Sequence, residues 1–343
     1  MKVEFKRATL KDIPGIIELC DECFEEKTDI GYAIKTFKAT SSDPNQIYLN
    51  GVLDGEIIAH LKISIIQTIP AITVRNLITH TSGLGYWFWS AALVKWETVT
   101  GVPNVVAGLK SSFAAPLLAD PGDAFIYGIN IDWLGRVIEA VTGKGLDVAV
   151  KEGVTGPLGM DQTTFAMTSD QQANSTPVHV RGEDGNWIAV GEVLNPQPEY
   201  WAGGHGLFGP PSDYIKFERA LLRGGELDGT RILQESTVDA ALRNQIGALD
   251  FPPELPTADP AAACDFSAGP GFKWGYGLLL NTADIPGMRR AWSGAWAGLC
   301  NTQFWIDRTA GICGSIYSNF LPFGTPEALA VYQGFEQAVY AAL

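Results

Sequence analysis

The spacing of apolar and polar residues changes along the first 70 positions. Alternation over a short run is typical of a half-buried strand, and apolar residues three and four apart are typical of a helix. These patterns predict a strand, a helix and a hairpin over residues 3–9, 10–26 and 47–66. Thr9 is placed to cap the helix, and Asp54-Gly55 is a two-residue hairpin signal. The N-terminal part is therefore predicted to be a strand-helix-hairpin segment.

Beyond residue 71 the same two patterns occur in longer alternation. They predict two helices, then two strands around a turn, then a terminal helix, over residues 134–141, 212–222, 302–319 and 326–343. Gly143 ends the first of these helices, and Ser212 is expected to be the N-cap of the second. Separate helices and strands in this order predict an α+β fold with the last helix packed on a sheet.

Composition changes near residue 70. All ten tryptophans lie at or after Trp87, and the first 70 residues are denser in charge than the remainder. A chain of 343 residues has room for one large domain or two smaller ones, because single cores rarely grow beyond about 250 to 300 residues. We therefore predict two parts, residues 1–70 and residues 71–343.

Charge limits the partners of the protein. The net charge of −14 argues against a nucleic-acid or anionic-membrane partner, because such binding depends on Lys and Arg. The N-terminus mixes charges into every turn, and the apolar run at 57–66 is interrupted by His60 and Lys62. Neither an export signal nor a membrane span is predicted. We expect a cytoplasmic protein.

Five cysteines are present, and Cys20 and Cys23 have the spacing of a metal or redox pair. No second pair or nearby histidine completes a zinc set, and the two residues share one face of a predicted helix. We therefore expect reduced thiols, no metal and no cofactor.

Residues 79–84, THTSGL, place His80 two positions before Ser82. A serine becomes nucleophilic when a general base lies beside it, so this pair is one candidate for a catalytic site. The alternative is that both residues build a turn. The residue types leave the two interpretations open.

Residues 72–84, ITVRNLITHTSGL, resemble a stretch of the serine β-lactamase and penicillin-binding-protein superfamily. With the following GYWF they are most similar to its esterase branch, the family VIII carboxylesterases. Further similar blocks follow in the same order, starting at Tyr127, Gly156, Gly203, Trp274 and Ala295. The resemblance implies a β-lactamase-like fold, with an antiparallel sheet flanked by helices and a mostly helical subdomain. It also implies that THTSGL is a helix end and a turn, and that Ser82 is not the nucleophile.

The resemblance further implies an ester-cleaving site in which a serine forms an acyl-enzyme. Tyr127 matches the tyrosine that moves protons, although Ile129 replaces the usual polar residue of that motif. Trp296 and Gly298 match the Trp-x-Gly box of the esterase branch, and the Leu299 backbone N–H matches an oxyanion donor. A small ester or acyl compound is the expected partner.

Three more residues are candidates for substrate binding. Trp87 and Trp89 are interpreted either as core residues or as a hydrophobic wall for an acyl group. His205, in the turn GGHGLFG, either builds that turn or lines the site.

The nucleophile is missing from the sequence pattern. The superfamily uses Ser-x-x-Lys, which brings both side chains to one face of a helix. No serine in this chain has a lysine three positions later; Ser212 and Lys216 are four apart, and Ser90 and Lys95 are five apart. The nucleophile is therefore unknown, and hydrolysis is expected to be impaired or absent.

Where relatives carry that helix, this chain has a segment that resembles the first half of GNAT acetyltransferases. The resemblance rests on residues 7–12, RATLKD, and covers about the first 70 residues. The turn with which that family holds the acetyl-CoA pyrophosphate is absent. Its nearest match, Arg308 to Cys313, falls in a strand-turn-strand pattern. The chain therefore has the pattern of a chimera, natural or engineered.

Three hypotheses remain: an active esterase, a non-catalytic binding protein on the same fold, and an acetyltransferase.

The opening helix and hairpin could take the places of the superfamily's first helix and hairpin in the sheet. Alternatively, the join leaves the core helix missing, and a partner in a homo-oligomer covers the gap.

Overall fold

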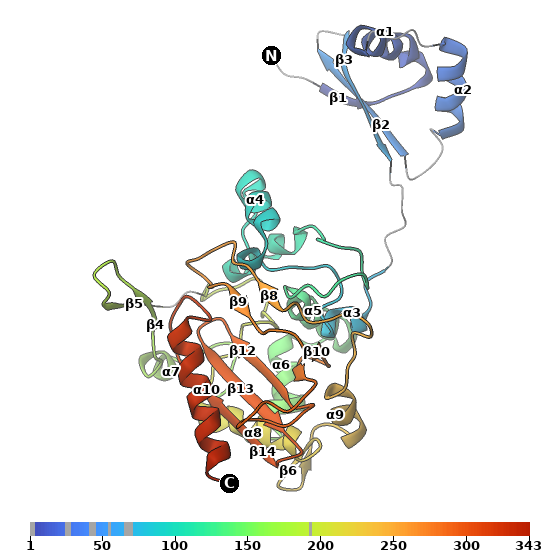
Figure 1. Ribbon diagram of the computed structural model, residues 1–343. Helices are drawn as coiled ribbons and strands as arrows, with labels where there is room; N and C mark the ends of the chain where they lie inside the picture. The colour runs from blue at the N-terminus through green and yellow to red at the C-terminus, as the bar shows by residue number, and fades with distance from the viewer. Residues whose placement is uncertain (1–3, 25–28, 41–45, 54–55, 65–70, 192–193) are drawn as a thin grey trace. The chain divides into compact units, whose positions relative to one another are not determined.

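The structure is a computed structural model that describes residues 4–24, 29–40, 46–53, 56–64, 71–191 and 194–343. The chain divides into two compact units, Met1–Ile69 and Pro70–Leu343. Figure 1 draws the smaller unit in blue and the larger one from cyan to red. Every candidate site residue belongs to the larger unit.

The smaller unit consists of an antiparallel sheet and two helices. Its strands run in the order β1-β2-β3, over Glu4–Arg7, Gln46–Leu53 and Glu56–Ser64, and its helices are α1, Ile13–Phe24, and α2, Ile30–Thr40. Ile13, Ile16 and Phe37 form a buried core that joins the two helices. Thr9 is the N-cap of a short 3₁₀ turn before α1, and its backbone N–H donates to the Asp12 carboxylate at 2.7 Å.

The predicted strand, helix and hairpin strands are present, and the structure adds a helix that the sequence prediction missed. Helix α2 has apolar residues three and four apart, but lysines and threonines lie between them and obscure this face. The predicted turn at residues 54–55 lies outside the described residues. Among the described strands, β1, β2 and β3 pair only with one another. The hypothesis that this segment takes the places of the superfamily's first helix and hairpin stays a prediction.

A five-stranded antiparallel sheet is the centre of the larger unit. Its strands run in the order β10 to β14, over Phe272–Trp274, Leu279–Asn281, Gly294–Gly298, Thr302–Asp307 and Ile312–Ile316, and the helices beside it are α8, Pro211–Leu222, and α10, Pro326–Ala341. On β13, Trp305 packs with Tyr332 of α10. The next residue, Ile306, points to the other face and packs with Leu221 of α8. The sheet therefore has one of these helices on each face (Figure 1).

Shorter elements complete the larger unit. Its other α-helices are α3 to α7 and α9, over Val74–Ile78, Ala91–Thr100, Asn130–Thr142, Leu146–Val150, Ser169–Ala173 and Glu235–Ala241. Three small two-stranded sheets are also present. They pair β4, Val178–Arg181, with β5, Trp187–Gly191; β6, Glu226–Leu227, with β7, Thr230–Arg231; and β8, Glu254–Leu255, with β9, Phe266–Ser267. The predicted α+β mixture of helices and antiparallel strands is confirmed. None of the helices in the described part of the chain has the length and apolar character that crossing a membrane requires.

Helix ends in this unit follow known capping preferences, with one correction to the prediction. Helix α5 is closed by Gly143, which has a positive φ of 68°, as predicted. The prediction of Ser212 as N-cap of α8 is wrong. The helix begins one residue earlier, at Pro211, because the fixed φ of proline suits the first helical position, and Pro210 is the cap.

Candidate functional site

The THTSGL turn is sealed inside the larger unit. Ser82 is fully buried; its hydroxyl donates to the side-chain oxygen of Asn130 and accepts from the Leu84 backbone N–H at 3.3 Å. His80 is buried as well, and its Nδ1 accepts from the Gly128 N–H at 3.4 Å. Each side chain therefore bonds to another part of the fold and not to its neighbour, so the pair is architecture and not a catalytic dyad.

Burial decides the chemistry of His80. Removal from water lowers the pKa of its imidazole to about 3, so the ring is neutral near pH 7. The ring packs against Tyr127, with centroids 4.5 Å apart. Gly83, the residue after Ser82, has a φ of 87°, and a Cβ at this position would lie 2.0 Å from the carbonyl oxygen of Ala119. The turn thus holds the loop that carries Tyr127.

Tyr127 and Trp296 are brought together by two distant parts of the chain. Trp296 lies on β12, and its indole N–H donates to the Tyr127 hydroxyl at 2.9 Å. Trp274, on β10, packs edge-on against Trp296 with ring centroids 4.6 Å apart, which restricts the orientation of the indole. Both Tyr127 and Trp296 are half-buried.

The Tyr127 hydroxyl keeps its proton near pH 7. Burial raises its pKa to about 12; the indole N–H of Trp296 acts in the opposite direction, and the nearby charge of Asp132 adds to the increase. A protonated phenol donates a hydrogen bond and is a poor proton acceptor. No described residue accepts the Tyr127 proton, so this hydroxyl has a donor to offer to a bound molecule.

Leu299 is the first residue of the turn between β12 and β13. The N–H of Asn301 donates to the Gly298 carbonyl at 2.9 Å, which closes a tight turn with Leu299 at its second position. The Asn301 side chain donates to the carbonyls of Phe320 and Pro322 and so fixes the turn to a neighbouring loop. The Leu299 N–H has no acceptor among the described residues.

Gly298 permits the close approach that this turn requires. A Cβ at Gly298 would lie 2.3 Å from the Oγ1 of Thr302, its partner across β12 and β13. A larger residue at this position would therefore require the Thr302 side chain to move. The small residue in the Trp-x-Gly box thus has a structural reason.

The two candidate tryptophans differ in their surroundings. Trp89 lies beside Tyr127, with ring centroids 5.7 Å apart, and its indole N–H is buried without a described acceptor. Trp87 turns away, and its indole N–H donates to Asp259 at 2.9 Å. Trp89 is therefore placed to contact a molecule bound at Tyr127, whereas the polar edge of Trp87 is already used within the fold.

His205 lies apart from that cluster and lines a pocket of about 100 Å³. Its Nδ1 is 3.6 Å from a carboxylate oxygen of Asp132, a fully buried residue of α5. The other carboxylate oxygen of Asp132 accepts from the Tyr86 hydroxyl at 3.3 Å, and the Tyr86 ring lies 5.4 Å from that of Tyr127. One carboxylate and one ring thus connect His205 to Tyr127.

A family model described as Beta-lactamase matches residues 67–338. The chain belongs to the beta-lactamase family. The β-lactamase-like fold that the sequence motifs imply is therefore confirmed, and the antiparallel sheet of β10 to β14 with α8 and α10 is its core.

Relatives within the beta-lactamase family carry out acyl chemistry. The chain is 30% identical to a monacolin J acid methylbutanoyltransferase of Aspergillus terreus, over 79% of this chain and 67% of that protein. It is 30% identical to a lovastatin esterase of Penicillium rubens, over 71% of this chain and 63% of that protein. A simvastatin synthase mutant from Aspergillus terreus aligns with all of this chain and 84% of its own, with a TM-score of 0.67 and 25% identity. The chain thus spans about two thirds of the length of these curated relatives.

Two serine–lysine pairs in this beta-lactamase-family chain come close to the Ser-x-x-Lys spacing, Ser90 with Lys95 and Ser212 with Lys216. One residue of each pair makes hydrogen bonds elsewhere in the fold. Ser90 is the N-cap of α4, where its hydroxyl accepts from the Leu93 N–H at 3.3 Å. Lys216 donates to the carbonyl of Gly159 and to Asp213, at 3.2 Å from the carboxylate. Neither pair has the arrangement in which a lysine activates a serine.

Sequence reasoning missed the buried residues that connect the site. Asp132 lies in the first turn of α5, where an acidic residue normally only complements the helix dipole, so its sequence position gave no sign of burial. Tyr86 lies within the GYWF stretch that carries the family resemblance, but the sequence assigned it no role. Among the described residues, no group of three His, Cys, Asp or Glu side chains has an arrangement that could hold a metal ion.

Proposed function

We propose that this protein binds small esters or acyl compounds, as a relative of the family VIII carboxylesterases, at the site formed by Tyr127, Trp296, Gly298 and Leu299. We propose also that it forms no acyl-serine of its own. The observation that carries the proposal is the half-buried Tyr127 hydroxyl, which accepts from Trp296 and retains a proton to donate. Leu299 packs against the same apolar cluster as Tyr127, and its N–H, which has no described acceptor, is proposed as the second donor. Two donors near one carbonyl oxygen are the requirement for an oxyanion site.

Two further features support binding without efficient turnover. Attack by a serine needs a base to take its proton, and a phenol with a pKa of about 12 is protonated near pH 7. The Ser-x-x-Lys pair that would supply both nucleophile and base is absent from the sequence. Binding energy at the carbonyl therefore has no covalent step to accelerate.

For the rest of the substrate we propose an apolar wall. Trp89 packs beside Tyr127 and is the main candidate to contact an acyl chain. Trp87 and His205 are proposed as its flanking contacts. One relative is named a methylbutanoyltransferase and another a lovastatin esterase, and the methylbutanoyl group in the first name supports a short branched acyl group as the substrate class.

A matched pair of substitutions at Leu299 tests the donor. Proline at the second position of a tight turn is favoured and removes the backbone N–H, whereas alanine keeps it. We expect Leu299→Pro to weaken binding of p-nitrophenyl butanoate by roughly threefold to tenfold, the effect of one hydrogen bond, with Leu299→Ala close to the wild type. Quenching of tryptophan emission measures the affinity. Equal affinity of the two variants would rule out the Leu299 donor.

Mass spectrometry after incubation with a phosphonate ester tests for a nucleophile. We expect no covalent adduct, because no serine has a lysine three positions later. An adduct on any serine would contradict the non-catalytic part of the proposal and identify the missing nucleophile. In that case Tyr127→Phe should reduce hydrolysis of a short-chain p-nitrophenyl ester.

For the N-terminal part we propose a GNAT-like segment, residues 1–70, joined to an esterase-like domain, residues 71–343, as in a chimera. The order of β1, α1, α2 and a hairpin supports this origin. Because the pyrophosphate-binding turn is absent, acetyl-CoA should not shift the melting temperature; a saturable shift would favour the acetyltransferase alternative.

A cytoplasmic location and a homo-oligomeric state stay predictions, and light scattering tests the oligomeric state.

A further inference from the structure

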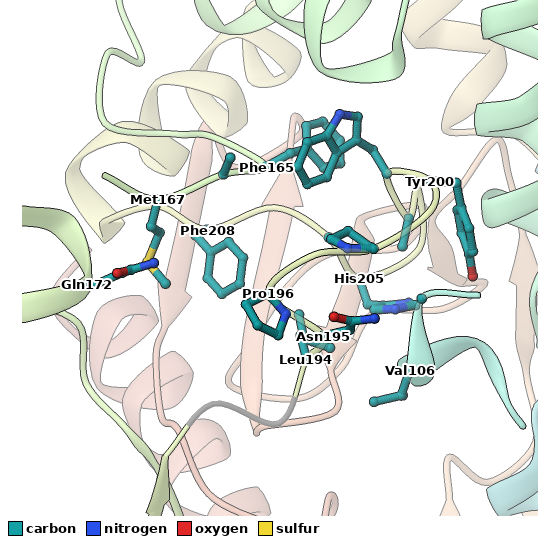
Figure 2. Close-up of a pocket in the computed structure, with 16 residues that line it drawn as sticks. Val106, Phe165, Met167, Gln172, Leu194, Asn195, Pro196, Tyr200, His205 and Phe208 are labelled. Carbon is teal, nitrogen blue, oxygen red and sulfur yellow. The ribbon is translucent and has the colours of Figure 1, made fainter. Parts of the chain in front are cut away.

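The pocket beside His205 is lined by aromatic and aliphatic residues. Phe165, Tyr200, Trp201 and Phe208 line it, in a volume of about 100 Å³ that opens to solvent. Figure 2 shows Phe165 and Phe208 on one side of His205 and Tyr200 on the other. Aromatic walls of this kind favour an apolar occupant with a ring or a short branched chain.

Two polar side chains of the pocket, those of Asn195 and Tyr200, are used within the fold. The Asn195 side chain donates to the Ala107 carbonyl at 2.9 Å and accepts from the Gln197 N–H at 2.9 Å. The Tyr200 hydroxyl donates to the Val105 carbonyl at 3.3 Å. These two side chains hold the pocket wall, whereas the Gln172 side chain, which also lines the pocket, has no described hydrogen-bond partner.

His205 is different, because only one of its two ring nitrogens faces a partner. Its Nδ1 lies 3.6 Å from Asp132, which also accepts from the Gly204 N–H at 3.0 Å and from the Tyr86 hydroxyl. A carboxylate beside Nδ1 favours the proton on that nitrogen, which leaves Nε2 as an acceptor in the neutral ring. No described residue donates to Nε2.

We propose that this pocket binds an apolar alcohol or phenol whose hydroxyl donates to the Nε2 of His205 while its hydrocarbon part packs between Phe165 and Phe208. A carboxylic acid fits less well, since at neutral pH it is an anion without a proton to donate and would lie near Asp132. Asp132 is a positioning residue that sets the proton on Nδ1. The residues that line this pocket do not include Tyr127, Trp296 or Leu299, so the alcohol site is proposed independently of the ester site.

Phenol and toluene are matched probes for this pocket. They have nearly the same shape, and only phenol has a hydroxyl to donate. The affinity ratio of phenol to toluene, measured by NMR titration, isolates the hydrogen bond when it is compared between wild type and His205→Phe. We expect the ratio to fall by roughly threefold to tenfold in the variant. An unchanged ratio, or no saturable binding of phenol, would overturn the proposal.

Nitrogen-15 signals of the four histidines give an independent readout that includes the positioning role. Phenol should shift the Nε2 signal of His205, identified as the one missing in His205→Phe. In Asp132→Asn the imidazole loses its fixed tautomer, so the phenol-to-toluene ratio should also fall; an unchanged ratio would contradict the role of Asp132.

A second variant separates this proposal from the ester site. Tyr127→Phe alters the proposed carbonyl donor but no group of the pocket, so phenol should bind with unchanged affinity. If ester binding fails the Leu299 test while phenol binding persists, the proposed function fails and the alcohol site stands. If ester binding passes and the phenol ratio is unchanged in His205→Phe, the alcohol site fails alone.

Discussion

The THTSGL turn and the Tyr127 site both contain side chains that form hydrogen bonds, but the two regions differ in exposure. In the turn, His80, Ser82 and its partner Asn130 are at most 2% exposed, and their side chains bond to neighbouring loops. At the site, Tyr127 and Trp296 are half-buried, and the Tyr127 proton has no described acceptor. A partly exposed side chain with an unused hydrogen-bond donor therefore indicates a candidate site better than the presence of serine and histidine does.

If the turn has a structural role, loss of the Asn130 side chain that binds it should lower the stability of the fold far more than loss of a side chain at the Tyr127 site. Asn130 accepts from Ser82 and donates to the carbonyls of Leu84 and Ile126, at 2.9 and 3.2 Å. We expect Asn130→Ala to lower the free energy of unfolding by about 3 kcal/mol, because it leaves several buried groups unpaired. Urea unfolding followed by tryptophan emission reports on the larger unit alone. Asn186→Ala, at an exposed turn, is the control, and a loss below about 1 kcal/mol for Asn130→Ala would contradict the comparison.

The burial of His80 also predicts how the free energy of unfolding depends on pH. The folded state lowers the pKa of His80 to about 3, whereas an unfolded histidine titrates near 6.5. The unfolded chain thus takes up the proton first, so the contribution of neutral His80 is complete above about pH 6.5 and is lost as the pH falls. From pH 7 to pH 5 we expect a loss of about 2 kcal/mol.

His80→Asn is the matched variant for that experiment, because asparagine tolerates the positive φ of 53° at this position and does not titrate. Its unfolding free energy should depend less on pH between 7 and 5. The same slope in wild type and variant would show that other groups cause the acid sensitivity.

The smallest effect is expected at the site itself. Tyr127→Phe removes only the acceptor of the Trp296 indole, and water can replace it at a half-buried position. We expect a loss of about 1 kcal/mol in the free energy of unfolding, measured with the same urea titration. A loss equal to that of Asn130→Ala would mean that Tyr127 is part of the sealed core and would weaken its candidacy as a binding residue.

Much of this organisation was predictable from local pattern. The strands around residue 307, the terminal helix and the end of α5 at Gly143 follow from short-range spacing and capping. Helix α2 was missed because polar residues interrupt its apolar face. The predicted start of α8 was one residue too late, because Pro211 takes the first helical position and Ser212 is not the N-cap. Such errors lie where two local preferences compete.

The family could be identified from the amino-acid sequence, because a series of motifs follows in a fixed order from residue 72 onward, and the same sequence shows that no Ser-x-x-Lys pair exists. The burial of Ser82 and His80, the hydrogen bond from Trp296 to Tyr127, and the place of buried Asp132 between Tyr86 and His205 became known from the folded chain. The reason is physical: burial and hydrogen-bond partners depend on residues more than 40 positions apart, and no local spacing records them.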